Sequence, residues 1–141
     1  MRGYLGRPAE TAAAFRDGWL CTGDVGHLDD GYLVLVDRKK DLIIRGGENI
    51  APSEIEAVIA GHPDVAEVAV VGRPHPDLGE EPVAFVATRT GQPADADDLL
   101  RFTARVLAKF KLPRAFICID RLPRNAVGKV DKTLLRKQAG P

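Results

Sequence analysis

Three short segments combine charged side chains and glycines in arrangements that could carry chemistry. Residues 18–24 end in a Gly-Asp pair after a short apolar run, which can place a carboxylate at a sheet edge to accept hydrogen bonds from two hydroxyl groups. Residues 37–49 hold five charged side chains in a row and then a Gly-Gly pair. Residues 123–129 place a lysine directly after a glycine on a polar loop, where it can reach a carboxylate or phosphate.

Each segment also has a simpler interpretation when it is taken alone. A Gly-Asp or Gly-Gly pair is usually a turn, and a surface lysine or charge run is usually solvated. A charged run between two apolar segments is nevertheless hard to bury and exchanges ion pairs with water at small cost, so residues 37–41 suit a hinge. Residues 123–129 lack the upstream glycines of a phosphate-binding P-loop, which excludes that motif.

The elements that must position these segments follow from turn residues and apolar periodicity. Residues 31–37 predict a strand entered from an Asp-Gly turn, and residues 65–71, 82–88 and 115–119 predict three more. Residues 73–81, with two prolines and a glycine, predict a loop. Helices are predicted over residues 53–61, 95–109 and 130–137.

The first of these helices carries the most detailed signals. Ser53 and Glu56 have the spacing of a capping box, and Pro52 stands just before them. Ile55, Val58 and Ile59 would lie on one face of the helix, which predicts that this face is buried.

Together the elements predict an α+β fold with a short, about three-stranded β-sheet flanked by helices, formed by residues 40–141. Residues 1–30 are rich in Gly, Asp and Arg and show little apolar periodicity. Because such a segment could not bury a core alone, we expect it to be a β-rich edge that packs against something larger.

Composition excludes several classes of protein. The 141 residues are 45% hydrophobic and 28% charged, with 20 Lys and Arg against 20 Asp and Glu, so no basic field favours nucleic acid or an anionic membrane. No apolar run is long enough for a membrane span. Two cysteines, Cys21 and Cys118, cannot form a disulfide framework, which makes a reducing cytoplasm the expected compartment.

The remaining reactive side chains predict no further site. Cys21 and Cys118 are expected to be small apolar fillers rather than nucleophiles. His27, His62 and His75 are scattered, without the ligand spacing of a metal site, so no metal-binding residue is predicted.

In this order and spacing, the three segments resemble the adenylate-forming (AMP-binding) superfamily, specifically its acyl-CoA ligase branch. The resemblance runs from Met1 to about Arg136. It rests on four groups of residues: Met1-x-Gly-Tyr-x-x-x-Pro8 with Thr11; Gly18-Trp19 with Thr22-Gly23-Asp24; Asp37-Arg38-x-Lys40-Asp41 with Gly46-Gly47-Glu-Asn-Ile-x-Pro52-x-Glu54-Ile-Glu56; and Lys111-Leu-Pro113 with Pro123-Arg-x-x-x-Gly128-Lys129.

The resemblance implies that residues 1–39 are the C-terminal edge of a large N-terminal AMP-binding domain and that residues 40–141 are the mobile lid domain. It implies a two-step ligase reaction. A carboxylic acid substrate reacts with ATP to give an acyl-adenylate, and CoA then displaces AMP, as in fatty-acid metabolism. Mg would enter with ATP and the large domain. Because that domain supplies the phosphate loop and the adenine and acyl pockets, the isolated chain is expected to ligate nothing.

The resemblance also implies roles for six residues. Lys129 would be the catalytic lysine of the lid, which bridges the carboxylate and phosphate oxygens during adenylation. Asp24 would hold the ribose hydroxyls of ATP or AMP, and Arg38 would contact the same nucleotide. Lys40 would be the hinge about which the lid turns, and Gly46 with Gly47 would line the CoA tunnel.

Three alternatives remain open. The pattern around Gly46 and Gly47 favours CoA as the acceptor over a carrier protein, and a luciferase-like oxidation is more remote. Asn49 stands where some relatives carry an arginine, so a contact with CoA phosphate is not expected there. From a different class, the chain could be a stand-alone lid subunit or binding module that docks on a separate large subunit, with Met1 either a native start or an edge of an excised piece.

Overall fold

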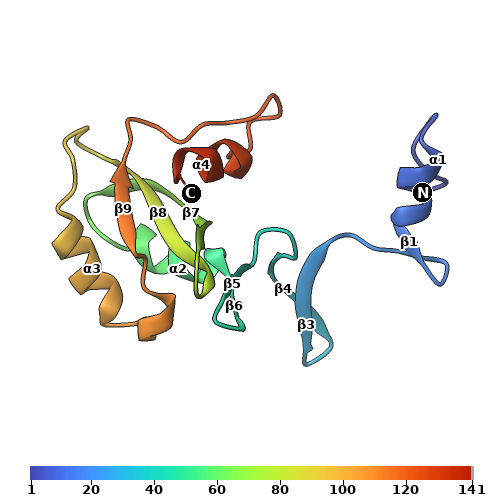
Figure 1. Cartoon of the computed structure of the whole chain (residues 1–141), viewed down its shortest axis with the longest axis horizontal. Helices are drawn as coiled ribbons and strands as arrows, with labels where there is room; N and C mark the ends of the chain where they lie inside the picture. Colours follow the sequence, from blue (N-terminus) through green and yellow to red (C-terminus); the bar gives the residue numbers. More distant parts are fainter. Residues whose placement is uncertain (141) are drawn as a thin grey trace. The chain divides into compact units, whose positions relative to one another are not determined.

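The computed structural model of the chain describes residues 1–140 and divides it into two compact units, Met1–Lys40 and Asp41–Pro141. Figure 1 traces the chain from the first unit, in blue, to the second, in green to red. The identity of residues 1–39 as the edge of a larger domain stays a prediction.

The first unit consists of one short helix and two separate β-hairpins. Helix α1 (Pro8–Ala13) precedes the hairpin of β1 (Phe15–Arg16) and β2 (Trp19–Leu20), and β3 (Asp24–Asp29) pairs antiparallel with β4 (Tyr32–Arg38). Strand β4 confirms the strand predicted after the Asp-Gly turn. Asp30 and Gly31 both have positive φ (46° and 84°), as a two-residue hairpin turn requires. None of residues 1–40 is buried.

The second unit is built on a five-stranded sheet flanked by helices. Its strands β5 (Ile43–Arg45), β6 (Glu48–Ile50), β7 (Val65–His75) and β8 (Gly79–Thr88) lie in the order β6-β5-β8-β7, and β9 (Ala115–Cys118) runs parallel beside β8. The helices are α2 (Pro52–Ala60), α3 (Ala96–Ala104), the 3-10 helix η1 (Lys109–Lys111) and α4 (Lys132–Gln138). The mixed α/β architecture is as predicted, but the sheet has five strands rather than about three.

The loop predicted over residues 73–81 is wrong, because β7 and β8 continue through most of it. Arg73 pairs with Glu81 across the two strands, and their side chains form an ion pair. Pro74 is tolerated because β7 is an edge strand, where a missing N–H need not face a neighbour. Only residues 76–78 remain as the turn of a long hairpin.

The capping box predicted at the start of α2 is also wrong. The N-cap residue is Ala51 rather than Ser53, its side chain forms no capping hydrogen bond, and Pro52 occupies the first turn. Glu56 instead accepts a hydrogen bond from the Val70 amide at 2.8 Å and an ion pair from Lys132 at 2.7 Å. The Glu56 carboxylate therefore connects α2 to strand β7 and helix α4 and does not cap its own helix.

The sheet buries apolar side chains on both faces. Helices α2 and α3 cover one face, and α4 covers the other. The predicted burial of Ile55 and Ile59 is confirmed, since both are fully buried. The first core contains Ile43, Ile50, Ile55, Ile59, Val65, Val70, Ala84, Val86, Leu99 and Leu107, and the second contains Ala69, Val71, Val83, Phe85, Leu122, Leu135 and Ala139.

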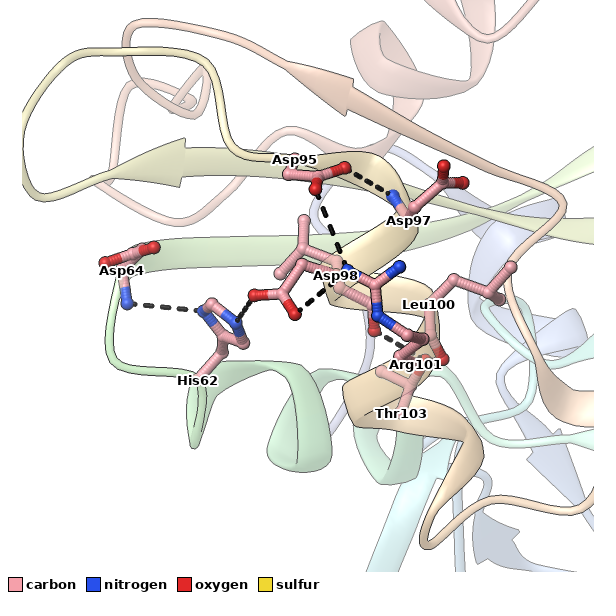
Figure 2. A network of polar contacts seen from close by, with 9 residues as sticks. His62, Asp64, Asp95, Asp97, Asp98, Leu100, Arg101 and Thr103 are labelled. Carbon is pink, nitrogen blue, oxygen red and sulfur yellow. Dashed lines mark hydrogen bonds and ion pairs between the residues drawn. The ribbon is translucent and has the colours of Figure 1, made fainter.

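Helix α3 ends at Ala104, five residues before the predicted end, and a polar network holds its first turn (Figure 2). The Asp95 carboxylate caps the helix by accepting from the Asp97 amide at 2.9 Å. Buried His62 lies with Nε2 3.1 Å from Asp98 Oδ2, and its Nδ1 is 3.3 Å from the Asp64 amide. Because the amide must donate to Nδ1, the ring proton is assigned to Nε2, which donates to Asp98.

The predicted burial of the two cysteines is wrong. Cys21 and Cys118 are both exposed, since Cys21 belongs to a unit without a core and Cys118 ends the short strand β9.

In the described part of the chain, no helix combines the length and the apolar character that a bilayer crossing requires.

Candidate functional site

Lys129 lies on the loop between β9 and α4, at the end of a tight turn. The Gly128 amide donates to the Asn125 carbonyl at 2.9 Å, and the Asn125 amide donates to the Lys129 carbonyl at 2.8 Å. Gly128 has φ +80°, a left-handed conformation that costs little without a Cβ. An isolated bridge between Arg124 and Val130 closes the base of the turn.

The side chains of Asn125 and Arg124 form hydrogen bonds with the backbone of this turn. Asn125 Oδ1 accepts from the amides of Val127 at 3.1 Å and Lys129 at 3.0 Å. Arg124 donates through Nη1 to the Gly128 carbonyl at 3.0 Å and through Nη2 to Glu67 Oε1 on β7 at 2.7 Å. The peptide between Gly128 and Lys129 is therefore held by side-chain contacts at both its carbonyl and its amide.

The Lys129 side chain itself is exposed, and no hydrogen bond or ion pair within residues 1–140 engages its ammonium group. An ammonium on a fixed backbone with no internal partner can bind an anion without first breaking an ion pair. The arrangement suits stabilisation of negative charge on carboxylate or phosphate oxygens.

Asp24 and Arg38, which are 14 positions apart in the sequence, are direct cross-strand partners of the β3–β4 hairpin. The Arg38 Nε lies 3.3 Å from Asp24 Oδ1, and the Asp24 amide donates to Thr22 Oγ1 at 3.1 Å. At the end of the hairpin the Arg38 side chain is 54% exposed and the Asp24 side chain 29%. The pair presents a carboxylate that can accept from hydroxyl groups and a guanidinium that can donate to oxygens.

Gly46 and Gly47 form the two-residue turn between β5 and β6, where Arg45 pairs with Glu48. Their φ values of +57° and +88° match the hairpin turn that requires positive φ at both central positions. The Gly46 amide donates to the Leu78 carbonyl at 2.8 Å, which ties this turn to the β7–β8 hairpin. The tight-turn interpretation thus accounts for both glycines by backbone conformation, and their CoA role stays a prediction.

Lys40 is the last residue of the first unit, and Asp41 is the first residue of the second. Asp41 forms an ion pair with Arg136 of α4 at 2.7 Å, so the chain becomes anchored immediately after Lys40. A pivot at Lys40 is compatible with this anchoring, but the hinge role stays a prediction.

The structure therefore brings Asp24 and Arg38 together within the first unit, and Gly46 and Gly47 together within the second. Lys129 belongs to the second unit, on a loop of its own. No group of three or more His, Cys, Asp or Glu side chains within residues 1–140 is arranged to hold a metal ion.

Sequence reasoning missed the residues that support Lys129. Asn125 was detectable, because Asn at the first and Gly at the fourth position is a common signature of a four-residue turn. Arg124 was visible only as a motif position without a role. Glu67 had no signal, since it meets Arg124 from 57 positions away.

Comparison with known proteins adds an independent line of evidence. A sequence model of the family described as AMP-binding enzyme C-terminal domain matches residues 54–129. The 2-succinylbenzoate–CoA ligase of Geobacillus kaustophilus is 46% identical over 137 residues, which cover 96% of this chain and 28% of that protein. The long-chain-fatty-acid–CoA ligase FadD13 of Mycobacterium tuberculosis is 45% identical over 139 residues, 98% of this chain and 27% of that protein.

A solved structure of a related enzyme is similar to this chain in fold as well as in sequence. The o-succinylbenzoate CoA synthetase (MenE) of Bacillus subtilis, in complex with its acyl-adenylate intermediate, matches with a TM-score of 0.87 and 43% identity. The match covers all of this chain and 28% of that one. The chain thus spans little more than a quarter of the length of these relatives.

Proposed function

The chain belongs to the family of AMP-binding enzyme C-terminal domains, and from this premise we propose that it is the C-terminal part of an ATP-dependent acyl-CoA ligase. Such an enzyme is an acid–thiol ligase that activates a carboxylic acid as an acyl-adenylate and transfers the acyl group to CoA. The names of the two similar ligases and the acyl-adenylate bound by the Bacillus enzyme support both steps.

The observation that carries the proposal is the state of Lys129, an exposed ammonium with no hydrogen bond or ion pair within residues 1–140, on a loop with a fixed backbone. In the adenylation step a carboxylate oxygen attacks the α-phosphorus of ATP and the bond to pyrophosphate breaks. Both reactants are anionic, and negative charge grows on the transferring oxygens. A positioned cation lowers this barrier, and removing such a group typically costs on the order of 10²–10³ in rate.

The other predicted site residues take roles in the same reaction. Asp24 would accept hydrogen bonds from the ribose hydroxyls of ATP, and Arg38, its cross-strand partner, would contact the nucleotide. Lys40 would be the pivot that withdraws Lys129 before the thiol enters, and the Gly46–Gly47 turn would leave room for the CoA arm. Mg would be held by ATP and the large domain.

The exposed apolar side chains of the first unit support a large N-terminal AMP-binding domain as its partner. Leu5 is 101% exposed, Trp19 80% and Tyr32 78%, and no residue of this unit is buried. Apolar surface on this scale is normally covered by other protein. Residues 1–39 would be the edge strands of that domain, and without it the chain is expected to ligate nothing.

One observation favours the alternative that the chain is a stand-alone lid subunit. The second unit has its own core on both faces of its sheet, as a separately folding lid subunit would need. An adenylation enzyme that loads a carrier protein would differ from a CoA ligase only in the acceptor of the acyl group. The two similar ligases are named for different acids, so the acyl substrate is not read from their shared C-terminal region.

The test is Lys129→Ala in the complete enzyme, with Lys137→Ala on α4 as a matched control at another exposed lysine. We expect acid-dependent pyrophosphate release to fall on the order of 10²–10³-fold in Lys129→Ala. Thioester formation from supplied acyl-adenylate should stay near the wild-type rate, and Lys137→Ala should change neither step. Equal loss in both half-reactions would show that Lys129 acts on something other than adenylation.

A further inference from the structure

The contacts around the Lys129 turn assign a function to Glu67, which belongs to no motif, and to Arg124, a motif position without an assigned role. We propose that Arg124 and Glu67 form a clamp that positions Lys129 for adenylation, a role that rests on the function proposed above. Neither side chain would touch substrate, so both are positioning residues that act through the backbone of the turn.

The clamp connects the loop that carries Lys129 to a strand of the central sheet. Glu67 lies on β7, a few residues before Ala69, Val70 and Val71, which are completely or almost completely buried. The Arg124 guanidinium reaches from the Glu67 carboxylate, at 2.7 Å, to the Gly128 carbonyl, at 3.0 Å. This carbonyl belongs to the peptide that also contains the Lys129 amide, so the clamp fixes the peptide from which the Lys129 side chain departs.

A β-bulge explains how Glu67 comes to face the loop. The register of β7 against β8 shifts between Val65 and Glu67, which changes the face to which the following side chains point. As a result, Val65 and Val70 both enter the core beneath α2 and α3, and Ala69 enters the core beneath α4. Glu67 shares the face of Ala69, where the loop and α4 lie.

The geometry requires an arginine. One planar guanidinium donates to two acceptors through separate nitrogens, whereas a lysine ammonium is a point charge without a fork. The clamp is also half exposed, with side-chain exposures of 49% for Arg124 and 38% for Glu67. Exposed ion pairs add little to stability, so substitutions here should leave the fold intact and act on the turn.

The experiment compares Arg124→Lys, Arg124→Ala and Glu67→Ala in the complete enzyme. We expect the kcat of adenylation to fall about 10- to 100-fold in the alanine variants, because small misplacements of a catalytic group have effects of this size. KM for ATP and for the acid should change little, and thioester formation from supplied acyl-adenylate should be spared. Arg124→Lys should resemble Arg124→Ala, and the double alanine variant should lose no more than either single one.

The control is Arg89→Ala, which removes another exposed arginine that donates to a backbone carbonyl, that of Pro63 at 3.0 Å. This variant should retain wild-type adenylation. Amide hydrogen exchange at Lys129 provides a readout that does not depend on catalysis. The Lys129 amide, which donates to Asn125 Oδ1, should exchange faster in the clamp variants than in wild type, and its exchange rate should not change in Arg89→Ala.

The outcomes separate this inference from the proposed function. If Lys129→Ala abolishes adenylation while Arg124→Ala and Glu67→Ala keep full adenylation and unchanged exchange at Lys129, the clamp is overturned and the proposed function stands. If Lys129→Ala itself leaves adenylation intact, the proposed function fails, and faster exchange at Lys129 would then show only a structural clamp.

Discussion

At the scale of single residues, neighbours decide what each charged group can do. The Lys129 ammonium has no partner within residues 1–140, whereas the Asp98 carboxylate forms ion pairs with His62 and Arg101 (Figure 2). The hydrogen bond from His62, supplemented by Arg101, lowers the pKa of Asp98 below its ordinary value of 3.8. His62 also packs edge-on against Phe102, with ring centroids 5.0 Å apart, so the pair joins the end of α2 to α3.

This pKa shift predicts a pH dependence of stability. A lowered folded-state pKa contributes stability that is present above pH 3.8 and is lost as the pH falls through the folded-state pKa, below 3.8. Asp98→Asn should therefore be less stable than wild type at neutral pH, and the two should converge in acid. Denaturant unfolding across this range measures the difference. Asp120→Asn, at an exposed aspartate, is the control, and a gap that stays constant with pH would contradict the prediction.

At the scale of elements, the β5–β6 hairpin depends on side chains from the neighbouring strands. Strand β5 pairs with β8 through only one residue pair, Arg45 with Gly79. Glu80 Oε2 adds a hydrogen bond from the Ile44 amide at 3.0 Å. The carboxylate lies where a Cβ on Gly72 would come within 2.8–2.9 Å of it, so the absence of a side chain at Gly72 makes room for this contact.

Gly72→Ala should displace the Glu80 carboxylate and remove its hydrogen bond to β5. We expect a loss of about 1.5–3 kcal/mol in the free energy of unfolding, the usual contribution of a hydrogen bond to a charged group. Glu80→Ala should lose a similar amount, and Glu80→Gln, which keeps an acceptor oxygen, should lose less. Denaturant unfolding gives the free energies. Unchanged stability and unchanged amide exchange at Ile44 in Gly72→Ala would show that Glu80 does not hold this strand.

At the scale of the whole molecule, the two units differ in how their structure is stabilised. Residues 41–140 bury apolar side chains on both faces of a sheet, and residues 1–40 bury none. Burial of apolar surface is the main favourable contribution to folding, and short hairpins without it are at best marginally stable in water. We therefore expect the first unit to need a covering partner and the second to fold without one.

Hydrogen exchange on the 141-residue chain would reveal this difference. Protected amides should be confined to the second unit, with the strongest protection in β7 and β8, and the amides of β1 to β4 should exchange nearly as fast as in an unfolded chain. A polypeptide of residues 41–141 should unfold in one cooperative transition. Strong protection within residues 1–40 would mean that the first unit is stable without a partner.

The sequence by itself was sufficient for features that depend on neighbouring residues. Periodicity predicted the helix that carries Ile55 and Ile59, and the Gly-Gly pair predicted a tight turn. Motif order identified the family, which the comparison with known proteins confirmed. It also singled out Lys129, whose catalytic role stays a prediction. Such signals are local because backbone preferences and turn conformations are set within a few residues.

Only the tertiary structure decided which distant residues meet. Strand β5 has three residues, too few for a periodic signal. It forms by pairing with β6 along its length, and it joins β8 through the pair of Arg45 with Gly79 and the hydrogen bond from Ile44 to Glu80. Glu56 has the spacing of a local cap but forms long-range contacts instead, and Glu67 reaches Arg124 only because a bulge turns it toward the loop. Contacts of this kind depend on strand register and on which face each core buries, and those are properties of the folded sheet rather than of any short segment.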